Sequence, residues 1–205
     1  MVINGVTMIT KVVVLHGLYM SGFVMRPLCA RLKKQGYGIL NVSYNTLNPD
    51  TDKIFAQIND FIADDQCAFV CHSLGGLIAR QYLSQAFPQT DQVKKVFTLG
   101  TPHKGAQIAR HMQDRGMQAL LKNSLEYLVS ESQDWPFSAQ LYSIAGDLPF
   151  GLLPLFEQGK PSDGTVMVDE TRVSGMAQHK VFHLSHTSLI YSRKVVDYIL
   201  AQLKT

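Results

Sequence analysis

The sequence is poor in the features that mark membrane and extracellular proteins. Its apolar runs fall well short of the roughly 18 consecutive residues that cross a bilayer. Only 3 of the 205 residues are cysteine, an odd number without paired spacing, which suits a reducing compartment rather than a disulfide framework. Residues 1–10 lack a basic region followed by a sustained apolar core, so we expect no signal peptide. These absences make a cytoplasmic location the default expectation.

Charge and metal ligands are also scarce. Against 19 Lys and Arg stand 16 Asp and Glu, and the net charge of +3 is too small and too dispersed to indicate a nucleic-acid-binding protein. Cys29, Cys67 and Cys71 have no neighbouring residues at metal-ligand spacing. No glycine-rich nucleotide loop is present. We therefore expect neither a metal nor another cofactor, and no nucleic-acid partner.

The length and hydrophobic pattern predict a single domain spanning residues 1–205. Buried-strand patterns alternate with helical spacing, which is typical of an α/β protein with a doubly wound, mostly parallel sheet of about six strands. Ligands of such sheets bind at the carboxyl ends of the strands. The expected strands are 11–15, 37–44, 67–72, 93–99, 140–145 and 180–184, and the clearest helices start after residues 50, 73 and 192.

The alternation pauses between residues 105 and 136. Apolar side chains there recur at helical spacing, from Met117 to Leu128, opposite polar ones. This pattern favours a core helix that covers the sheet, and the alternative is a partly mobile cap above a binding site. We take a cap insertion at about 104–136 as an expectation within the single domain.

The stretch around Ser73 predicts a strained turn between a strand and a helix. The apolar run that begins at Cys67 reaches a serine, and Gly75 and Gly76 follow it at the start of a helical pattern. This is the form of a nucleophile elbow, G-x-S-x-G, which exposes the serine above the sheet. Cys71 replaces the first glycine of that pattern. A serine N-cap on an ordinary strand–helix turn is the alternative interpretation.

From about Lys11 to the C-terminus, the chain resembles the α/β-hydrolase family, and in particular its small lipase and esterase branch. The resemblance rests on the elbow and on three further stretches in the same order: residues 12–18 (VVVLHGL), residues 98–105 (TLGTPHKG), and residues 161–166 (PSDGTV) with His186 beyond them. The resemblance implies an α/β-hydrolase fold with a small helical cap. It also implies a serine hydrolase activity.

A serine nucleophile needs a histidine base and a carboxylate that orients the histidine. The family presents these residues in the order serine, acid, histidine. His186 stands between the last expected strand and the last helix, where the resemblance places the base. His183 falls inside the expected strand and His179 precedes it, so neither is favoured.

The other histidines near the motifs are expected to have supporting roles. His16 is interpreted as a brace of its loop rather than as a base. Strand alternation would turn His72 away from the face of Ser73, so we expect it to be structural. His103 is a weak candidate in a turn that shapes the site.

Two aspartates follow the fifth expected strand. Asp163 lies in Ser162-Asp163-Gly164, which resembles the acid-bearing loop of lipases. Asp147 falls directly at the strand end, where other hydrolases carry their acid, and its alternative role is a turn residue before Pro149. Asp163 is the favoured acid.

The tetrahedral intermediate of acyl transfer needs two backbone amides that stabilise its oxyanion. The resemblance assigns one to Leu74, immediately after the nucleophile, and the other to Leu18, after His16-Gly17.

The substrate is suggested by an apolar segment, residues 148–156, near the acid. It either lines an acyl pocket or packs beneath the helix of 105–136. We expect an esterase or lipase that cleaves a small-molecule ester or a lipid-like substrate with a medium or long acyl chain, through an acyl-enzyme on Ser73. The alternatives are an acyltransferase, thioesterase or amidase on the same residues, or a binding domain without turnover, for which Cys71 is the one warning sign.

Overall fold

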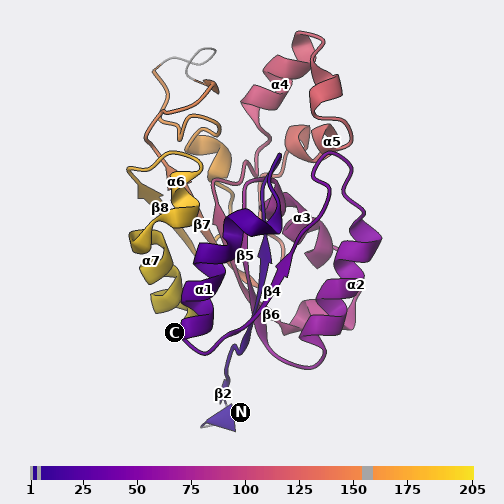
Figure 1. Ribbon diagram of the computed structural model, residues 1–205, viewed down its shortest axis with the longest axis vertical. Coiled ribbons are helices and arrows are strands. Elements are labelled where there is room, and N and C mark those ends of the chain that lie inside the picture. The colour runs from indigo at the N-terminus through magenta and orange to yellow at the C-terminus, as the bar shows by residue number, and fades with distance from the viewer. Residues whose placement is uncertain (1, 4–5, 154–158) are drawn as a thin grey trace.

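The computed structural model describes residues 2–3, 6–153 and 159–205, and its centre is a six-stranded sheet in which every neighbouring pair is parallel (Figure 1). The strand order is β4-β3-β5-β6-β7-β8. These strands are β3 (Lys11–Leu15), β4 (Gly38–Val42), β5 (Cys67–His72), β6 (Val93–Leu99), β7 (Gln140–Gly146) and β8 (Gln178–Phe182). A separate antiparallel pair, β1 (Val2–Ile3) and β2 (Val6–Thr7), lies below the sheet in Figure 1.

Helices cover both faces of this sheet, as the strand–helix alternation predicts. The helices that pack on the sheet are α1 (Arg26–Lys34), α2 (Thr51–Ile62), α3 (Leu74–Leu83), α6 (Ser188–Tyr191) and α7 (Arg193–Leu203). Alternate residues of β3 enter two different cores: Val13 packs in the core with α2 and α3, and Val12 in the core with α1, α6 and α7. The doubly wound α/β fold with about six strands is therefore confirmed.

Capping and turn residues in the sequence mark where several of these helices and strands begin and end. The Asp50 side chain accepts a hydrogen bond from the Lys53 amide at 3.2 Å and so caps α2. Gly36, after α1, has a φ of 94°, a conformation that glycine adopts without a steric penalty. Strands β3, β5 and β6 have the predicted bounds.

The last strand lies two residues earlier than the apolar pattern indicates. Strand β8 covers Gln178–Phe182, because its pairing with β7 runs from Tyr142 to Gly146 and stops there. His179 therefore lies within the strand, and His183 lies beyond its end. The register at this sheet edge is set by the neighbouring strand rather than by the most apolar residues of the segment.

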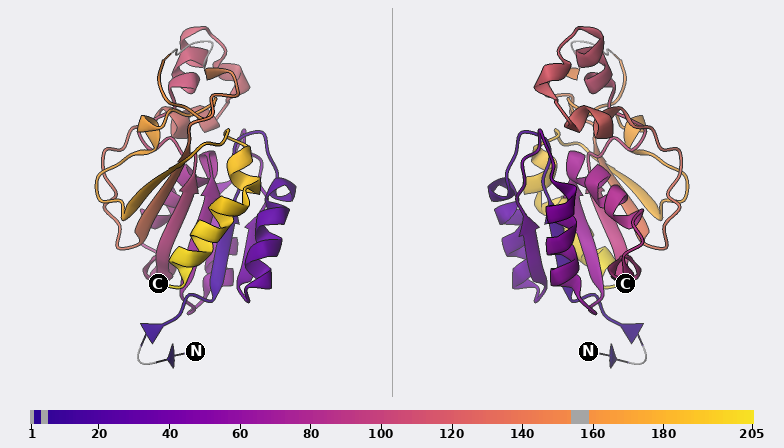
Figure 2. Two further views of the ribbon diagram at one scale, coloured as in Figure 1. Left: turned by 90° about the vertical axis from the view of Figure 1, so that its left-hand side faces the viewer. Right: turned by 90° about the vertical axis from the view of Figure 1, so that its right-hand side faces the viewer.

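The prediction of one helix across residues 117–128 is wrong. The segment forms α4 (Gln107–Asp114), a 3₁₀ turn η3 (Gln118–Leu120) and α5 (Ser124–Val129). Positive φ values at Gly116 (72°) and Lys122 (47°) interrupt it. Leu121 and Leu128 are buried in the core, whereas Leu120 is exposed. Both views of Figure 2 place α4 beyond the carboxyl ends of the strands.

None of the helices in the described parts of the chain has the length and apolar character needed to span a bilayer.

Candidate active site

Ser73 occupies a strained turn at the carboxyl end of β5. Its φ of 52° and ψ of −121° lie outside the regions that non-glycine residues favour, and such strain is held by the surrounding structure. The Ser73 amide donates to the Leu99 carbonyl at 2.9 Å, and the Thr101 hydroxyl donates to the Ser73 carbonyl at 2.9 Å. A Cβ at Gly75 would stand 2.6 Å from the Leu15 carbonyl oxygen. The turn thus needs glycine where the helix approaches the sheet.

Cys71 does not prevent this turn from forming. Its side chain is fully buried in the core beside α2 and α3, in register with Leu15. Burial raises the pKa of the Cys71 thiol, so the neutral thiol behaves as a small apolar side chain. The core therefore accommodates the larger residue at the position where the motif usually has glycine.

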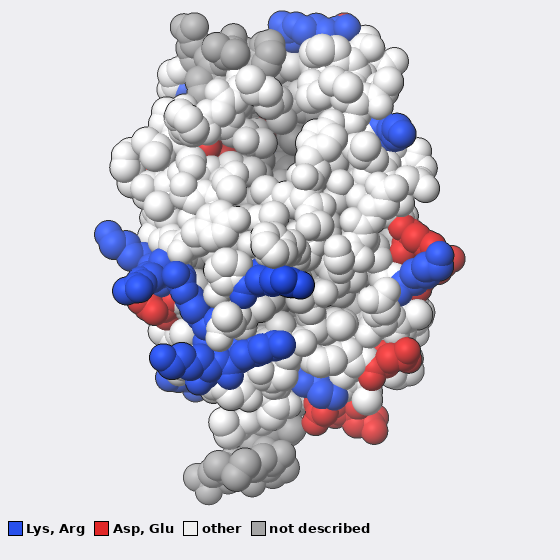
Figure 3. Space-filling view, viewed as in Figure 1, with Lys and Arg blue, Asp and Glu red and all other residues white. Residues whose placement is uncertain are grey.

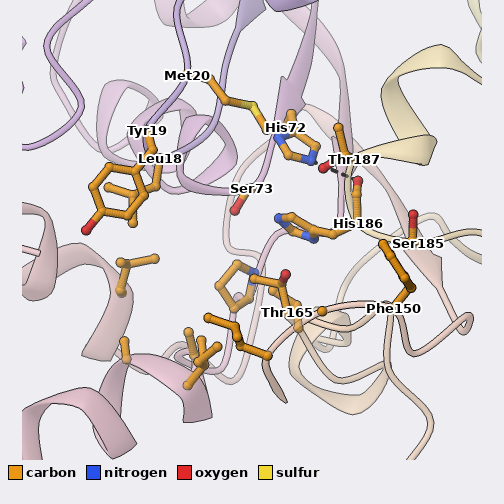
Figure 4. A pocket seen from close by; sticks show the side chains of 18 of the residues that line it. Leu18, Tyr19, Met20, His72, Ser73, Phe150, Thr165, Ser185, His186 and Thr187 are labelled. Carbon is orange, nitrogen blue, oxygen red and sulfur yellow. Dashed lines mark hydrogen bonds between the residues drawn. The ribbon is translucent and has the colours of Figure 1, made fainter. Parts of the chain in front are cut away.

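His186 and Asp163 meet above the same edge of the sheet. The Nδ1 atom of His186 lies 2.7 Å from Oδ2 of Asp163, and the His186 amide donates to the Asp163 carbonyl at 2.9 Å. The other carboxylate oxygen accepts from the amides of Thr165 and Val166 at 3.0 and 2.8 Å. Donation from Nδ1 to this carboxylate leaves Nε2 of His186 with the lone pair. In Figure 4 the ring of His186 faces the hydroxyl of Ser73.

Two glycines make room for this pair at the strand ends. Gly100, after β6, has a φ of 61°, and a Cβ there would lie 2.9 Å from both Oδ2 of Asp163 and Nδ1 of His186. At Gly146, the last residue of β7, a Cβ would lie 2.8 Å from Cβ of Asp163. Gly100 belongs to the motif of residues 98–105, but the motif does not predict that Gly100 packs against Asp163 and His186.

Asp147 is directed elsewhere. Its carboxylate lies 2.9 Å from Nδ1 of His183, and the His183 side chain is largely exposed. The Asp147 amide donates to the Phe182 carbonyl at 3.1 Å, which ties this residue to the edge strand β8. The structure therefore brings Asp163, and not Asp147, to His186.

The two backbone amides at Leu18 and Leu74 border the site. Leu74 is the first residue of α3, so its N–H has no partner within the helix. Leu18 lines the same cavity as Ser73 and lies in a turn closed by donation from the Met20 amide to the Gly17 carbonyl. The structure thus places Leu18 at the cavity wall and the Leu74 amide next to Ser73 in the chain.

His16 supports that turn from behind, as the sequence predicts for a brace. Its ring stacks on Tyr44 at a centroid distance of 4.2 Å, and its Nε2 accepts from the Tyr44 amide at 3.2 Å. The Tyr44 hydroxyl donates to the His16 carbonyl at 2.5 Å. Burial lowers the pKa of His16 and favours the neutral ring that this contact requires.

His72 lies at the site, contrary to the expectation from strand alternation. Its Nε2 donates to the His186 carbonyl at 3.1 Å, and the two rings are 4.6 Å apart (Figure 4). Burial, followed by the proximity of His186, lowers the pKa of His72. Alternation fails here because Ser73 is not part of the strand, and its positive φ redirects the chain immediately after His72.

His103 is separated from this group. Its Nε2 lies 3.1 Å from the Thr98 hydroxyl, and its ring packs edge-on against Trp135. It lines a different cavity, between α3 and α5.

Glu170 is a buried acid near the site that no motif indicated. Its two carboxylate oxygens accept from the Gln107 amide, at the start of α4, and from the Met167 amide, at 2.5 and 2.7 Å. Glu170 thereby joins α4 to the loop that carries Asp163. Burial raises the pKa of its carboxyl from about 4.5 to about 7, and the nearby Asp163 acts in the same direction. A single glutamate without a recognisable pattern offers no signal in one sequence.

This raised pKa predicts a stability that falls as pH increases. Between pH 5 and 7 the folded chain holds a proton on Glu170 that the unfolded chain releases, so the free energy of unfolding declines across that window. We expect the difference in unfolding free energy between wild type and Glu170→Gln to fall by on the order of 2 kcal/mol from pH 5 to pH 8. Urea unfolding at several pH values measures it. The histidines titrate in both proteins, so their contributions cancel in the difference between the two unfolding free energies. A difference that stays constant from pH 5 to pH 8 would contradict the prediction.

A cavity of about 1080 Å³ opens in front of Ser73 and His186, and its walls are mainly apolar. Leu18, η3, α4 and the segment 148–152 form them. Residues 148–152 line the cavity, and because Phe150 is 82% exposed and Leu152 63%, these two side chains are not packed beneath the helices. Pro154, Leu155 and Phe156, the rest of the apolar segment, lie outside the described residues. In Figure 3 the hollow on the upper face is bordered mostly by uncharged side chains, while Lys and Arg gather lower down.

The parallel sheet with helices on both faces and a serine on a strained strand–helix turn defines an α/β-hydrolase fold. The chain belongs to the PGAP1-like alpha/beta domain family, whose sequence profile matches residues 37–147. The resemblance to the α/β-hydrolase family is thereby confirmed. No curated protein shows significant sequence similarity to the chain.

Several solved structures have the same fold. The mature lipase BlEst2 of Bacillus licheniformis is 18% identical, with a TM-score of 0.76 over 95% of this chain and 91% of that one. Phospholipase PlaB of Legionella pneumophila is 16% identical, with a TM-score of 0.72 over 97% of this chain and 60% of that one. A metagenomic carboxyl esterase is 17% identical, with a TM-score of 0.62 over 95% and 75%.

Proposed function

We propose that the chain is a serine hydrolase that cleaves carboxylic esters through an acyl-enzyme on Ser73. The observation that carries the proposal is the 2.7 Å contact between His186 and Asp163, at the same sheet edge where the His186 ring faces Ser73 (Figure 4). Each of the three residues comes from a loop after a different strand. Such convergence of a hydroxyl, an imidazole and a carboxylate is the arrangement that activates serine.

In the proposed reaction, Nε2 of His186 takes the proton of Ser73 Oγ as this oxygen attacks the ester carbonyl. Asp163 keeps the ring oriented and stabilises the imidazolium that forms. The amides of Leu18 and Leu74 donate to the oxyanion of the tetrahedral intermediate. His186 then protonates the leaving alcohol. In the second half, His186 deprotonates a water molecule, which attacks the acyl-enzyme, and the proton returns to Ser73 as the acid is released.

The proteins with similar solved structures favour esters over other acyl compounds as the substrate class. The similar solved structures are named as a lipase, a phospholipase and a carboxyl esterase. The apolar cavity supports an acyl group of medium or long chain, because an alkyl chain gains about 0.8 kcal/mol per buried CH₂. We further propose that α4, η3 and α5, within residues 104–136, act as a cap insertion of a single domain.

Covalent labelling with a fluorophosphonate probe tests the enzymatic proposal. The probe phosphonylates an activated serine, so the purified protein should gain one adduct, which peptide mass spectrometry should locate on Ser73. A protein that folds but gains no adduct is the result expected of a binding domain. Comparing an ester, a thioester and an amide of the same acyl chain then separates the esterase from a thioesterase or an amidase.

The acyl-chain claim predicts a preference that depends on Phe150. We expect kcat/KM to rise at least tenfold from acetate to octanoate esters of the same alcohol. Phe150→Gln should reduce the octanoate value several-fold and leave the acetate value nearly unchanged, because only the longer chain reaches this wall. Phe23→Gln is the matched control, since Phe23 is also exposed, at 69%, but lies outside the cavity. Turnover of acetate esters alone would refute the claim.

A further inference from the structure

A second cavity lies between α3 and α5, and its lining is mainly polar. Its volume is about 320 Å³, and it shares no lining residue with the cavity in front of Ser73. Helix α3 contributes Arg80 and Gln81, the loop after β6 contributes His103, and the end of α5 with the following segment contributes Ser130 and Ser132. The proposed reaction uses none of these side chains.

This cavity gathers buried polar atoms that lack hydrogen-bond partners. In the described parts of the chain, five buried side-chain nitrogen or oxygen atoms have none. Three of them belong to residues that line this cavity, namely Arg80 (Nη1), Gln81 (Oε1) and His103 (Nδ1). Because a buried polar group without a partner is destabilising, a cluster of three at one cavity indicates a missing polar partner.

The Arg80 guanidinium is held in place, and one of its nitrogens, the buried Nη1, has no hydrogen-bond partner. Its Nη2 donates to the Asp134 carbonyl at 2.5 Å, and its plane lies over the rings of Trp135 and Phe137 at 5.4 and 5.7 Å. Within the described residues it forms no ion pair with a carboxylate. A partly buried, stacked guanidinium with an unpaired N–H group is suited to an oxyanion, which it binds through directed N–H bonds.

His103 supplies a second group at the same place. Its side chain is 1% exposed, and its Nε2 is occupied by the Thr98 hydroxyl at 3.1 Å. When that hydroxyl donates to Nε2, Nδ1 carries the proton and becomes a donor. Burial, and then the charge of Arg80, lower the pKa of His103 to about 3, so the ring is neutral and donates without adding charge.

We propose that this cavity is a binding site for a small oxyanion, a carboxylate or a phosphate, held by Nη1 of Arg80 and Nδ1 of His103. The hydroxyls of Ser130 and Ser132 are the additional donors at the cavity wall. Exposed Glu126 also lines the cavity, and its negative charge disfavours large polyanions. Gln81 Oε1 can accept a hydrogen bond from the hydroxyl of a monoprotonated phosphate.

The site is separate from Ser73 but shares its supports. Arg80 follows Ser73 by seven residues along α3, a rise of about 10 Å. His103 lies two residues after Thr101, whose hydroxyl donates to the Ser73 carbonyl. An ion in this cavity therefore contacts the helix and the loop that hold Ser73, without entering the acyl cavity.

Isothermal titration with sodium phosphate and with sodium acetate, each against sodium chloride at equal ionic strength, tests the proposal. We expect saturable binding of at least one oxyanion to wild type and at least tenfold weaker binding to Arg80→Gln. Arg26→Gln is the matched control, because Arg26 also stacks on an aromatic ring, Phe23 at 4.9 Å, yet lies outside the cavity. Its affinity should equal that of wild type. Ser73→Ala should also bind normally, which separates this site from the proposed esterase site.

Nuclear magnetic resonance gives a second measurement if Arg80→Gln does not fold. The ring signals of His103 should shift with phosphate or acetate concentration in wild type, and Arg80→Lys, which keeps the charge but loses the planar fork, should weaken that response. The proposal is overturned if neither ion binds saturably, which would mean that the cavity holds water alone. It is overturned equally if Arg80→Gln retains full affinity, or if Arg26→Gln loses as much.

Discussion

Alanine in place of Ser73 is expected to lower kcat for ester hydrolysis by on the order of 10⁴ to 10⁶-fold. The variant loses the only protein atom that forms a bond to the acyl group in the proposed reaction, and the rest of the site remains. Within the described residues the Ser73 hydroxyl forms no hydrogen bond, so its removal should leave the fold intact. Initial rates with an octanoate ester measure the effect, and fluorophosphonate labelling should disappear in parallel.

Ser185→Ala provides the control for this experiment. Ser185 lines the same cavity, next to His186, but its hydroxyl is paired with that of Ser188 at 2.7 Å. We expect its kcat to stay within about tenfold of wild type, and its labelling to persist. An active Ser73→Ala enzyme, with labelling moved to another serine, would overturn the assignment of the nucleophile.

The second large effect should come from the acid. We expect Asp163→Asn to lower kcat by on the order of 10⁴-fold, because an asparagine amide no longer fixes the tautomer of His186 or stabilises its positive charge. The Asp163 carboxylate is 1% exposed and satisfied by two backbone amides besides His186. The chain offers no second acid at His186 that could replace it within the described residues.

Asp147→Asn is the matched variant, since the sequence made Asp147 the rival acid. Its carboxylate contacts the exposed His183, so we expect kcat to change by no more than a few-fold. Steady-state kinetics of both variants with the same ester at one pH compare the two. A larger loss in Asp147→Asn than in Asp163→Asn would require a different arrangement of the loop after β7.

The strand–helix alternation and several strand ends could be predicted from the sequence alone. Continuous apolar β-branched runs such as 11–15 belong to strands that are buried on both faces, and they need no information about their neighbours. The elbow at Ser73 was predicted from the small residues around it, because a tight strand–helix turn leaves no room for side chains at Gly75. The order of the motifs then placed Asp163 and His186 at one sheet edge.

Other features depended on contacts between distant segments. The place of His72 against His186 arises because the loop after β8 passes the end of β5, 114 residues away in the sequence. Glu170 stands out only in the folded structure, where one amide of α4 and one of the Asp163 loop both donate to its carboxylate. The division of 105–136 into α4, η3 and α5 reflects turns at Gly116 and Lys122 that the hydrophobic spacing does not record.

The sequence by itself determined the class of fold, and it predicted Ser73, His186 and, as the favoured acid, Asp163 for the proposed reaction, since each depends on local pattern and on the order of motifs along the chain. The tertiary structure decided which aspartate meets the histidine, which apolar segment faces the cavity, and that unpartnered polar atoms of Arg80, Gln81 and His103 surround one hollow. The physical reason is that hydrogen bonds and burial are properties of atoms that fold together, and no spacing within a single segment encodes them.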